Sequence, residues 1–172
     1  MKTSRLFILF AALAAGAFAQ SSPPPPSPPI HHDFDFWIGE WEVFGKNGSA
    51  AKVGESRVEA ISGGYGILEN WSALGVYNLG TSISNYEAHS GQWQQYYIGT
   101  GGGTTLYKGG MVGDKMVMIA EAFTAKGARY LTRGTWTPNP DGSVRQQFEI
   151  STDDGKTWQP SFDGLYKRKP AR

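Results

Sequence analysis

Short segments rich in Thr, Tyr, Val, Ile and Trp alternate with glycine-containing turns along almost the whole chain after residue 33, and this pattern limits the fold most. Turns such as Lys46-Asn47-Gly48, Ser62-Gly63-Gly64 and Pro140-Asp141-Gly142 supply residues that accept the positive φ of tight hairpins. No window longer than about ten residues in this region repeats its apolar positions with the helical period. The sequence therefore predicts an all-β protein.

The alternation of β-forming segments and turns predicts about ten strands. These are Gly39–Phe44, Gly54–Ile61, Gly64–Ala73, Thr81–Ala88, Gln92–Ile98, Thr104–Lys108, Lys115–Phe123, Ala128–Thr137, Val144–Ile150 and Thr157–Arg168. Strands joined by short turns form an antiparallel meander, and a meander of this length closes into a barrel because closure removes its exposed edges. We expect a single antiparallel meander β-barrel of about ten strands.

The first nineteen residues have the features of a secretory signal peptide, with cleavage expected after Ala19. Lys2 and Arg5 form a basic start, and Leu6–Phe18 is an apolar run rich in Ala and Leu. The run is too short for a comfortable membrane span, which needs about 20 apolar residues, although an uncleaved anchor is the alternative. We therefore expect an exported protein, periplasmic or secreted, without a membrane span after cleavage.

The composition indicates how the chain divides into a linker and a domain, and it excludes some kinds of site and partner. Residues 20–32 contain the segment SSPPPPSPP and are expected to form an extended linker, followed by one domain over residues 33–169. The chain has no Cys, which excludes disulfides and thiolate metal sites. Its 16 basic and 15 acidic residues provide no excess of positive charge for nucleic acid. Nothing in the sequence indicates an oligomeric state.

The stretch Phe36-Trp37-Ile38-Gly39 leads into Trp41 through a Gly-x-Trp pattern. A short 3₁₀ turn followed by such a strand resembles the start of lipocalin-type barrels. The resemblance implies that Trp41 points inward and closes one end, and that a cation from the last strand stacks on it, with Arg168 as the candidate. The alternative is an ordinary aromatic strand of the core.

Four stretches extend the resemblance over about Asp33 to Arg168: FDFWIGEWEV, SRVEAISGGYGILENW, SGQWQQYYI and DDGKTWQPSFDGLYKRK. They are similar to those of a family of uncharacterised bacterial exported domains with a lipocalin-like fold. The resemblance implies a calycin-type barrel with a cavity for a small ligand. It implies no known reaction.

Residues Ser151 to Trp158, STDDGKTW, match the Asp-box pattern S-x-D-x-G-x-T-W. In this pattern the Asp153 carboxylate accepts hydrogen bonds from turn amides, Gly155 takes a positive φ and Trp158 packs under the turn. One copy in a chain this short cannot form a propeller of repeated blades. We therefore expect a structural hairpin rather than a glycosidase element.

Metal, haem and phosphate sites have weak support in the sequence. His31 and His32 are adjacent, so their side chains would point in opposite directions from a strand, and His89 lies in a predicted turn. We expect no metal site and no cofactor, although haem held by Tyr or Met is not excluded by this reasoning. The Gly-rich segment Gly99–Gly110 precedes a strand rather than a helix, so it is interpreted as a hairpin, with a lid at the barrel mouth as one possible role.

Strand alternation suggests which side chains line a cavity, but it leaves open which face of each strand points inward. Several faces combine large aromatic rings with a single polar group, as expected for a site that binds a small amphipathic molecule. The candidate ligand-binding residues are Trp41, Glu69, Trp71, Trp93, Tyr97 and Arg133. A core filled by side chains is the alternative.

Three functions follow from these patterns. The first is an exported, non-enzymatic barrel that binds a small hydrophobic or amphipathic ligand. The second is a small-barrel enzyme, an isomerase or hydrolase, in which Glu69 or Glu149 acts with Arg133 or Arg145 inside the barrel. The third is a structural or interaction module of the envelope without a cavity. No catalytic residue is assigned, because nothing in the sequence fixes the distances between these groups.

Overall fold

The computed structural model of the protein describes residues 26–75 and 77–170. The predicted signal peptide and the first part of the proline-rich segment lie outside these residues. Within the described part of the chain, no helix is long and apolar enough to cross a membrane.

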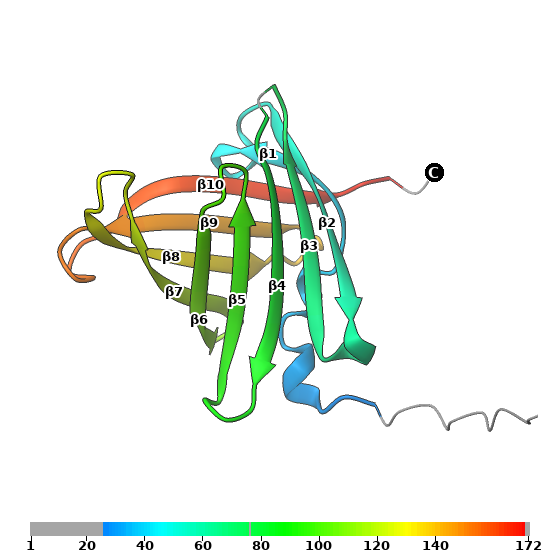
Figure 1. Ribbon diagram of the computed structural model, residues 1–172. Coiled ribbons are helices and arrows are strands. Elements are labelled where there is room, and N and C mark those ends of the chain that lie inside the picture. The colour runs from blue at the N-terminus through cyan, green and yellow to red at the C-terminus, as the bar shows by residue number, and fades with distance from the viewer. Residues whose placement is uncertain (1–25, 76, 171–172) are drawn as a thin grey trace, which may run out of the picture.

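Ten antiparallel strands form a closed barrel in which each strand pairs with its neighbours in sequence and the last pairs with the first (Figure 1). The strands are β1 (Gly39–Gly45), β2 (Lys52–Ile61), β3 (Gly66–Ala73), β4 (Leu79–Glu87), β5 (Gln92–Gly99), β6 (Thr104–Val112), β7 (Lys115–Phe123), β8 (Arg129–Pro138), β9 (Val144–Ser151) and β10 (Gln159–Arg168). The register of β1 on β10, with Trp41 opposite Arg168 and Val43 opposite Tyr166, completes the closure. The predicted meander barrel is confirmed.

The two sides of the barrel run in different directions. Strands β3, β4 and β5 run roughly vertically in Figure 1, whereas β8, β9 and β10 run roughly horizontally behind them. Side chains alternate between the two faces, as in β7, where Met116, Met118 and Ala120 are buried between more exposed neighbours. The buried face of each strand points into the barrel.

Most predicted strand boundaries differ from the structure by one to four residues, and three of the differences have a clear local reason. β3 begins two residues later because Ser62–Gly64 forms a 3₁₀ turn, η4, in which all three residues have positive φ. β6 runs on to Val112 because Gly109 continues the ladder where its backbone lies close to β7; a Cβ there would meet the Val117 carbonyl oxygen at 2.1 Å. β10 begins at Gln159, after the turn of the Asp-box.

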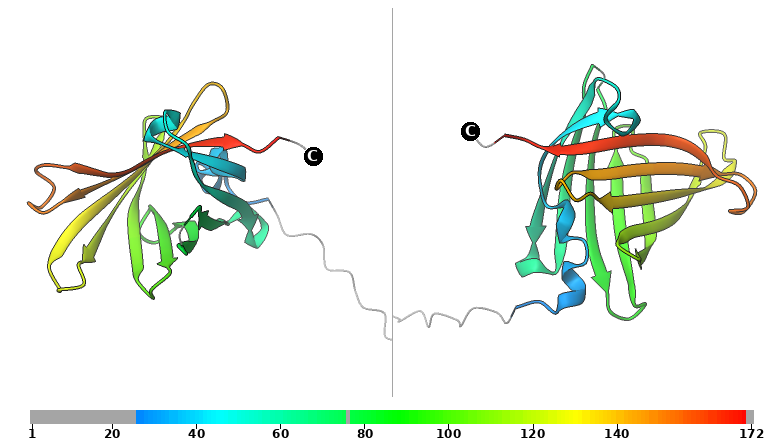
Figure 2. Two further views of the ribbon diagram at one scale, coloured as in Figure 1. Left: turned by 90° about the horizontal axis from the view of Figure 1, so that it is seen from above. Right: turned by 180° about the vertical axis from the view of Figure 1, so that it is seen from behind.

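The N-terminal segment closes one end of the barrel with two 3₁₀ turns, η1 (Pro29–His32) and η2 (Asp35–Trp37) (Figure 2). Phe34 and Trp37 are fully buried, and their rings stack with centroids 5.1 Å apart. Trp136 packs on both rings, at 5.3 Å from Phe34 and 5.6 Å from Trp37. These aromatic contacts make the segment the plug of the barrel.

Packing against the barrel starts earlier than the predicted domain boundary at residue 33. The His31 ring lies 4.7 Å from Tyr65 and 5.6 Å from Tyr86, and the Ser27 hydroxyl forms a 2.9 Å hydrogen bond with His32 Nε2. The last part of the predicted linker is therefore held on the barrel surface by aromatic and polar contacts.

Trp41 and Arg168 form the contact implied by the lipocalin resemblance. The Arg168 guanidinium carbon lies 4.5 Å from the centre of the fully buried Trp41 ring, and Arg168 Nη1 donates a 3.1 Å hydrogen bond to the Ile38 carbonyl. Trp41 Nε1 donates to the Trp37 carbonyl at 2.9 Å. Together these contacts fasten the last strand to the plug.

The Asp-box forms the expected hairpin lock between β9 and β10. Asp153 accepts hydrogen bonds from the Ser151 hydroxyl at 2.7 Å, from the Thr157 backbone amide at 2.9 Å and from the Thr157 hydroxyl at 2.6 Å. Gly155 has a φ of 83°, and Trp158 Nε1 donates to its carbonyl at 3.1 Å. All of these contacts lie within the turn, so the motif stabilises the hairpin.

Candidate functional site

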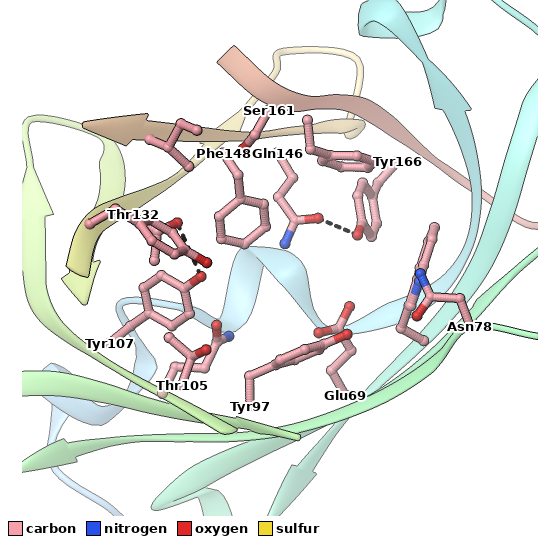
Figure 3. A pocket seen from close by; sticks show the side chains of 15 residues that line it. Glu69, Asn78, Tyr97, Thr105, Tyr107, Thr132, Gln146, Phe148, Ser161 and Tyr166 are labelled. Carbon is pink, nitrogen blue, oxygen red and sulfur yellow. Dashed lines mark hydrogen bonds between the residues drawn. The ribbon is translucent and has the colours of Figure 1, made fainter. Parts of the chain in front are cut away.

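A cavity of about 410 Å³ lies inside the barrel, next to the aromatic core that the plug completes (Figure 3). Its walls come from β3, β5, β6, β8, β9 and β10, with one residue from the connection between β3 and β4. The fifteen lining residues are Glu69, Trp71, Asn78, Gln95, Tyr97, Thr105, Tyr107, Tyr130, Thr132, Gln146, Phe148, Ile150, Ser161, Phe162 and Tyr166. The volume lies in the range of small-molecule sites.

Aromatic rings form most of the apolar wall. The Trp71 ring lies 6.4 Å from that of Tyr166 and 6.3 Å from that of Phe162, measured between ring centroids. Tyr107 and Phe148 continue the wall, with their centroids 5.7 Å apart. A flat or chain-like apolar molecule would contact ring faces on several sides.

Two glycines make room for two of the rings. A Cβ at Gly54 would lie 2.3 Å from the Trp71 ring, and a Cβ at Gly80 would lie 2.2 Å from the Tyr97 hydroxyl. Both rings therefore lie directly on the backbone of a neighbouring strand. The cavity keeps its width because larger residues are absent at these two positions.

Glu69 is the one carboxyl group in the lining, and only 5% of its surface is exposed. Ser56 and Ser82, on the strands either side of β3, donate hydrogen bonds to its two oxygens at 2.9 and 3.1 Å. Burial raises the pKa of Glu69 to about 7, against the opposing effect of these two hydrogen bonds. The carboxyl group therefore changes its charge near neutral pH.

Hydroxyl and amide groups complete the polar part of the cavity. The Tyr166 hydroxyl donates to Gln146 Oε1, and the Tyr107 hydroxyl lies 3.4 Å from Thr132 Oγ1. Burial raises the pKa of Tyr97 and of Tyr166, and the Glu69 charge acts in the same direction on both. These phenols stay neutral at ordinary pH and serve as hydrogen-bond partners.

The glycine-rich turn after β5 is hydrogen-bonded to the connection between β3 and β4. The Thr100 hydroxyl forms 3.3 Å hydrogen bonds with the Asn78 side chain and with the Leu79 carbonyl, and the Thr100 amide donates to Leu79 at 2.9 Å. These bonds attach the turn to the β3–β4 connection and hold Asn78 at the cavity wall. The possible role of the turn as a lid gains no support from these contacts.

The candidate ligand-binding residues divide into three groups in the structure. Glu69, Trp71 and Tyr97 line the cavity. Trp41 and Trp93 are buried in the aromatic core and do not reach the cavity lining. Arg133 does not face the interior: it pairs with Glu149 at 2.7 Å, and its guanidinium carbon lies 4.2 Å from the Trp158 ring centre.

The neighbours of Arg133 explain why this residue is outside. Thr132, Gly134 and Trp136 are the buried positions of β8, so Arg133 belongs to the opposite face. Strand pairing places Arg133 directly opposite Glu149 on β9. The prediction that Arg133 lines the cavity is therefore corrected.

Most of the cavity lining was missed by sequence reasoning. Alternation from Trp136 along β8 reaches Thr132 and Tyr130, and alternation along β9 places Gln146, Phe148 and Ile150 on one face. Both sets were readable as alternating faces. The sequence contains no signal that shows which of the two faces of each strand points into the barrel.

The groups proposed for an enzyme do not converge inside the barrel. Glu69 lies inside, whereas Glu149 pairs with Arg133 and Arg145 pairs with Asp163 at 2.8 Å on the outer surface. Among residues 26–75 and 77–170, no three His, Asp or Glu side chains form a group that could hold a metal ion. The arrangement provides a chamber with one acid, rather than a pair of groups for acid–base chemistry.

Comparison of the chain with known proteins gave no match to a protein-family model and no match among curated proteins. The geometry of the cavity is therefore the basis for assigning a function.

Proposed function

We propose that the protein is an exported, non-enzymatic barrel that binds one small apolar or amphipathic molecule. The observation that carries the proposal is the cavity of about 410 Å³, which has aromatic walls and a few polar groups aimed into it. Such a combination suits a ligand with an apolar body and one polar end. A purely structural module is expected to have a filled core, because an empty cavity lowers the stability of the folded protein.

Export is proposed from the sequence features of residues 1–19 and from the resemblance of the barrel to bacterial exported lipocalin-like domains. In this proposal the protein acts in the periplasm or the medium and carries or stores its ligand there. The closed barrel supports the proposal because its hydrogen-bonded wall separates an apolar ligand from water.

Binding is tested with the neutral hydrophobic fluorophore N-phenylnaphthylamine, which brightens in apolar sites. Thr104 and Thr105 provide a matched pair of variants, because they are neighbours on β6 and only Thr105 lines the cavity. We expect one binding site per chain, loss of binding in Thr105→Trp and retained binding in Thr104→Trp. Equal binding of the fluorophore by both variants would overturn the proposal, as would failure of the unaltered protein to bind any hydrophobic probe of this size.

A further inference from the structure

The position of Glu69 in the cavity specifies the kind of ligand. We propose that the cavity takes a cationic amphiphile, an amine whose ammonium group binds the Glu69 carboxylate while its apolar body lies among the aromatic rings. This inference rests on the proposed ligand-binding function and adds the charge of the ligand.

Glu69 has no cationic partner among the described residues. Every ion pair among the described residues uses another carboxylate, and Glu69 has hydrogen bonds from the Ser56 and Ser82 hydroxyls only. Within the part of the chain that the structure describes, no Lys, Arg or His lines the cavity. A buried carboxylate without a counter-charge is unfavourable, and an incoming cation would relieve this cost.

The Glu69 carboxylate also has free acceptor positions. An ionised carboxylate offers about four acceptor positions, and the two serine hydroxyls use one on each oxygen. Figure 3 shows the carboxyl group reaching into the cavity between Tyr97 and Tyr166. The free positions therefore face the space that a ligand would fill, and an ammonium group has three donors for them.

Aromatic side chains line the cavity around this carboxylate. Trp71 lies two residues from Glu69 on the same face of β3, and the Tyr166 and Phe162 rings lie 6.4 and 6.3 Å from the Trp71 ring. Ring faces attract cations within about 6 Å, and most strongly where water is excluded. The same carboxylate would repel the head group of an anionic amphiphile, so the site distinguishes between the two charges.

The groups that face Glu69 make cation binding dependent on pH. They are the Ser56 hydroxyl from β2, the Ser82 hydroxyl from β4, Tyr97 from β5 and Tyr166 from β10. The phenols have raised pKa values and do not titrate near neutral pH, so Glu69, with a pKa of about 7, is the group that changes charge. Affinity for a cation should fall roughly a hundredfold from about pH 8 to about pH 5.

The test compares three probes of nearly the same shape by isothermal titration calorimetry on the protein expressed from its full sequence. The probes are naphthylmethylamine, which is a cation, naphthalenemethanol, which is neutral, and naphthaleneacetate, which is an anion. A charge-assisted hydrogen bond predicts that the cation binds roughly 10- to 100-fold more tightly than the alcohol. Glu69→Gln should remove this advantage, whereas Glu40→Gln, at an exposed position on β1, should keep it.

The possible outcomes separate the two proposals. A cation preference that disappears in Glu69→Gln and at low pH supports both. If the alcohol or the acetate binds as tightly as the amine, the cationic ligand is refuted while the ligand-binding barrel stands. If none of the three probes binds and N-phenylnaphthylamine does not bind either, both proposals are refuted.

Discussion

Replacing Glu69 by Gln should change how the stability of the protein depends on pH. The folded-state pKa of about 7 lies above the ordinary value of 4.5 expected in the unfolded chain. A carboxyl group of this kind contributes stability below its unfolded pKa, and this contribution is lost as the pH rises through the folded pKa. The wild-type protein should therefore lose stability from this one group between about pH 5 and about pH 8.

The size of this stability loss follows from the difference between the folded and unfolded pKa values of Glu69. Each unit corresponds to about 1.4 kcal/mol, so the loss over this interval amounts to about 2 to 3 kcal/mol. Gln has nearly the shape of the protonated acid and stays neutral. We therefore expect Glu69→Gln to match the wild type near pH 5 and to exceed its free energy of unfolding by about 2 to 3 kcal/mol near pH 8.

Urea denaturation at the two pH values measures this difference. The groups with pKa values lowered to about 2, Glu55, Glu87 and Asp153, titrate below the interval and are the same in both proteins. Glu40→Gln is the control, because this exposed side chain should leave the pH dependence of the wild type unchanged. A variant that loses as much stability as the wild type between the two pH values would refute the buried, unpaired state of Glu69.

Three further substitutions test the barrel and its cavity. Arg168→Met removes the cation from the Trp41 ring and should lower the free energy of unfolding by about 1 kcal/mol in urea denaturation; no change would show that the contact adds nothing. Ser151→Ala removes a buried hydroxyl from the Asp-box and should cost about 1 to 3 kcal/mol in the same assay, and an unchanged unfolding midpoint would contradict the hairpin lock. Gly80→Ala should push Tyr97 into the cavity and weaken N-phenylnaphthylamine binding, which fluorescence titration would detect; unaltered affinity would mean that the ring moves without loss of space.

The barrel was predictable because its signals are local. Asn47 and Gly63 have positive φ within short turns, as their positions in the sequence indicate, and each turn fixes the direction of the next strand. Trp41 and Arg168 are far apart in sequence, but the resemblance to lipocalin-type barrels predicted the contact that the structure contains. Turn chemistry and one long-range contact were enough to define the architecture.

The cavity lining was less predictable because both faces of several strands carry similar residues. On β8, Leu131 and Arg133 alternate with Thr132 and Trp136, so hydrophobicity does not decide which face is buried. Arg133 lies over the Trp158 ring on the outer face, a contact between residues 25 positions apart that the sequence does not indicate. A ligand cavity also contains polar groups, so the rule that apolar residues point inward does not identify its lining.

Native mass spectrometry of the protein purified from the cells that naturally produce it tests the central claim most directly. We expect a discrete mass above that of the denatured chain, which corresponds to one bound small molecule. This excess mass should be absent from the cavity-filling Thr105→Trp variant. An intact mass equal to that of the chain alone, in protein that also fails to bind added naphthylmethylamine and N-phenylnaphthylamine, would contradict a ligand-binding barrel.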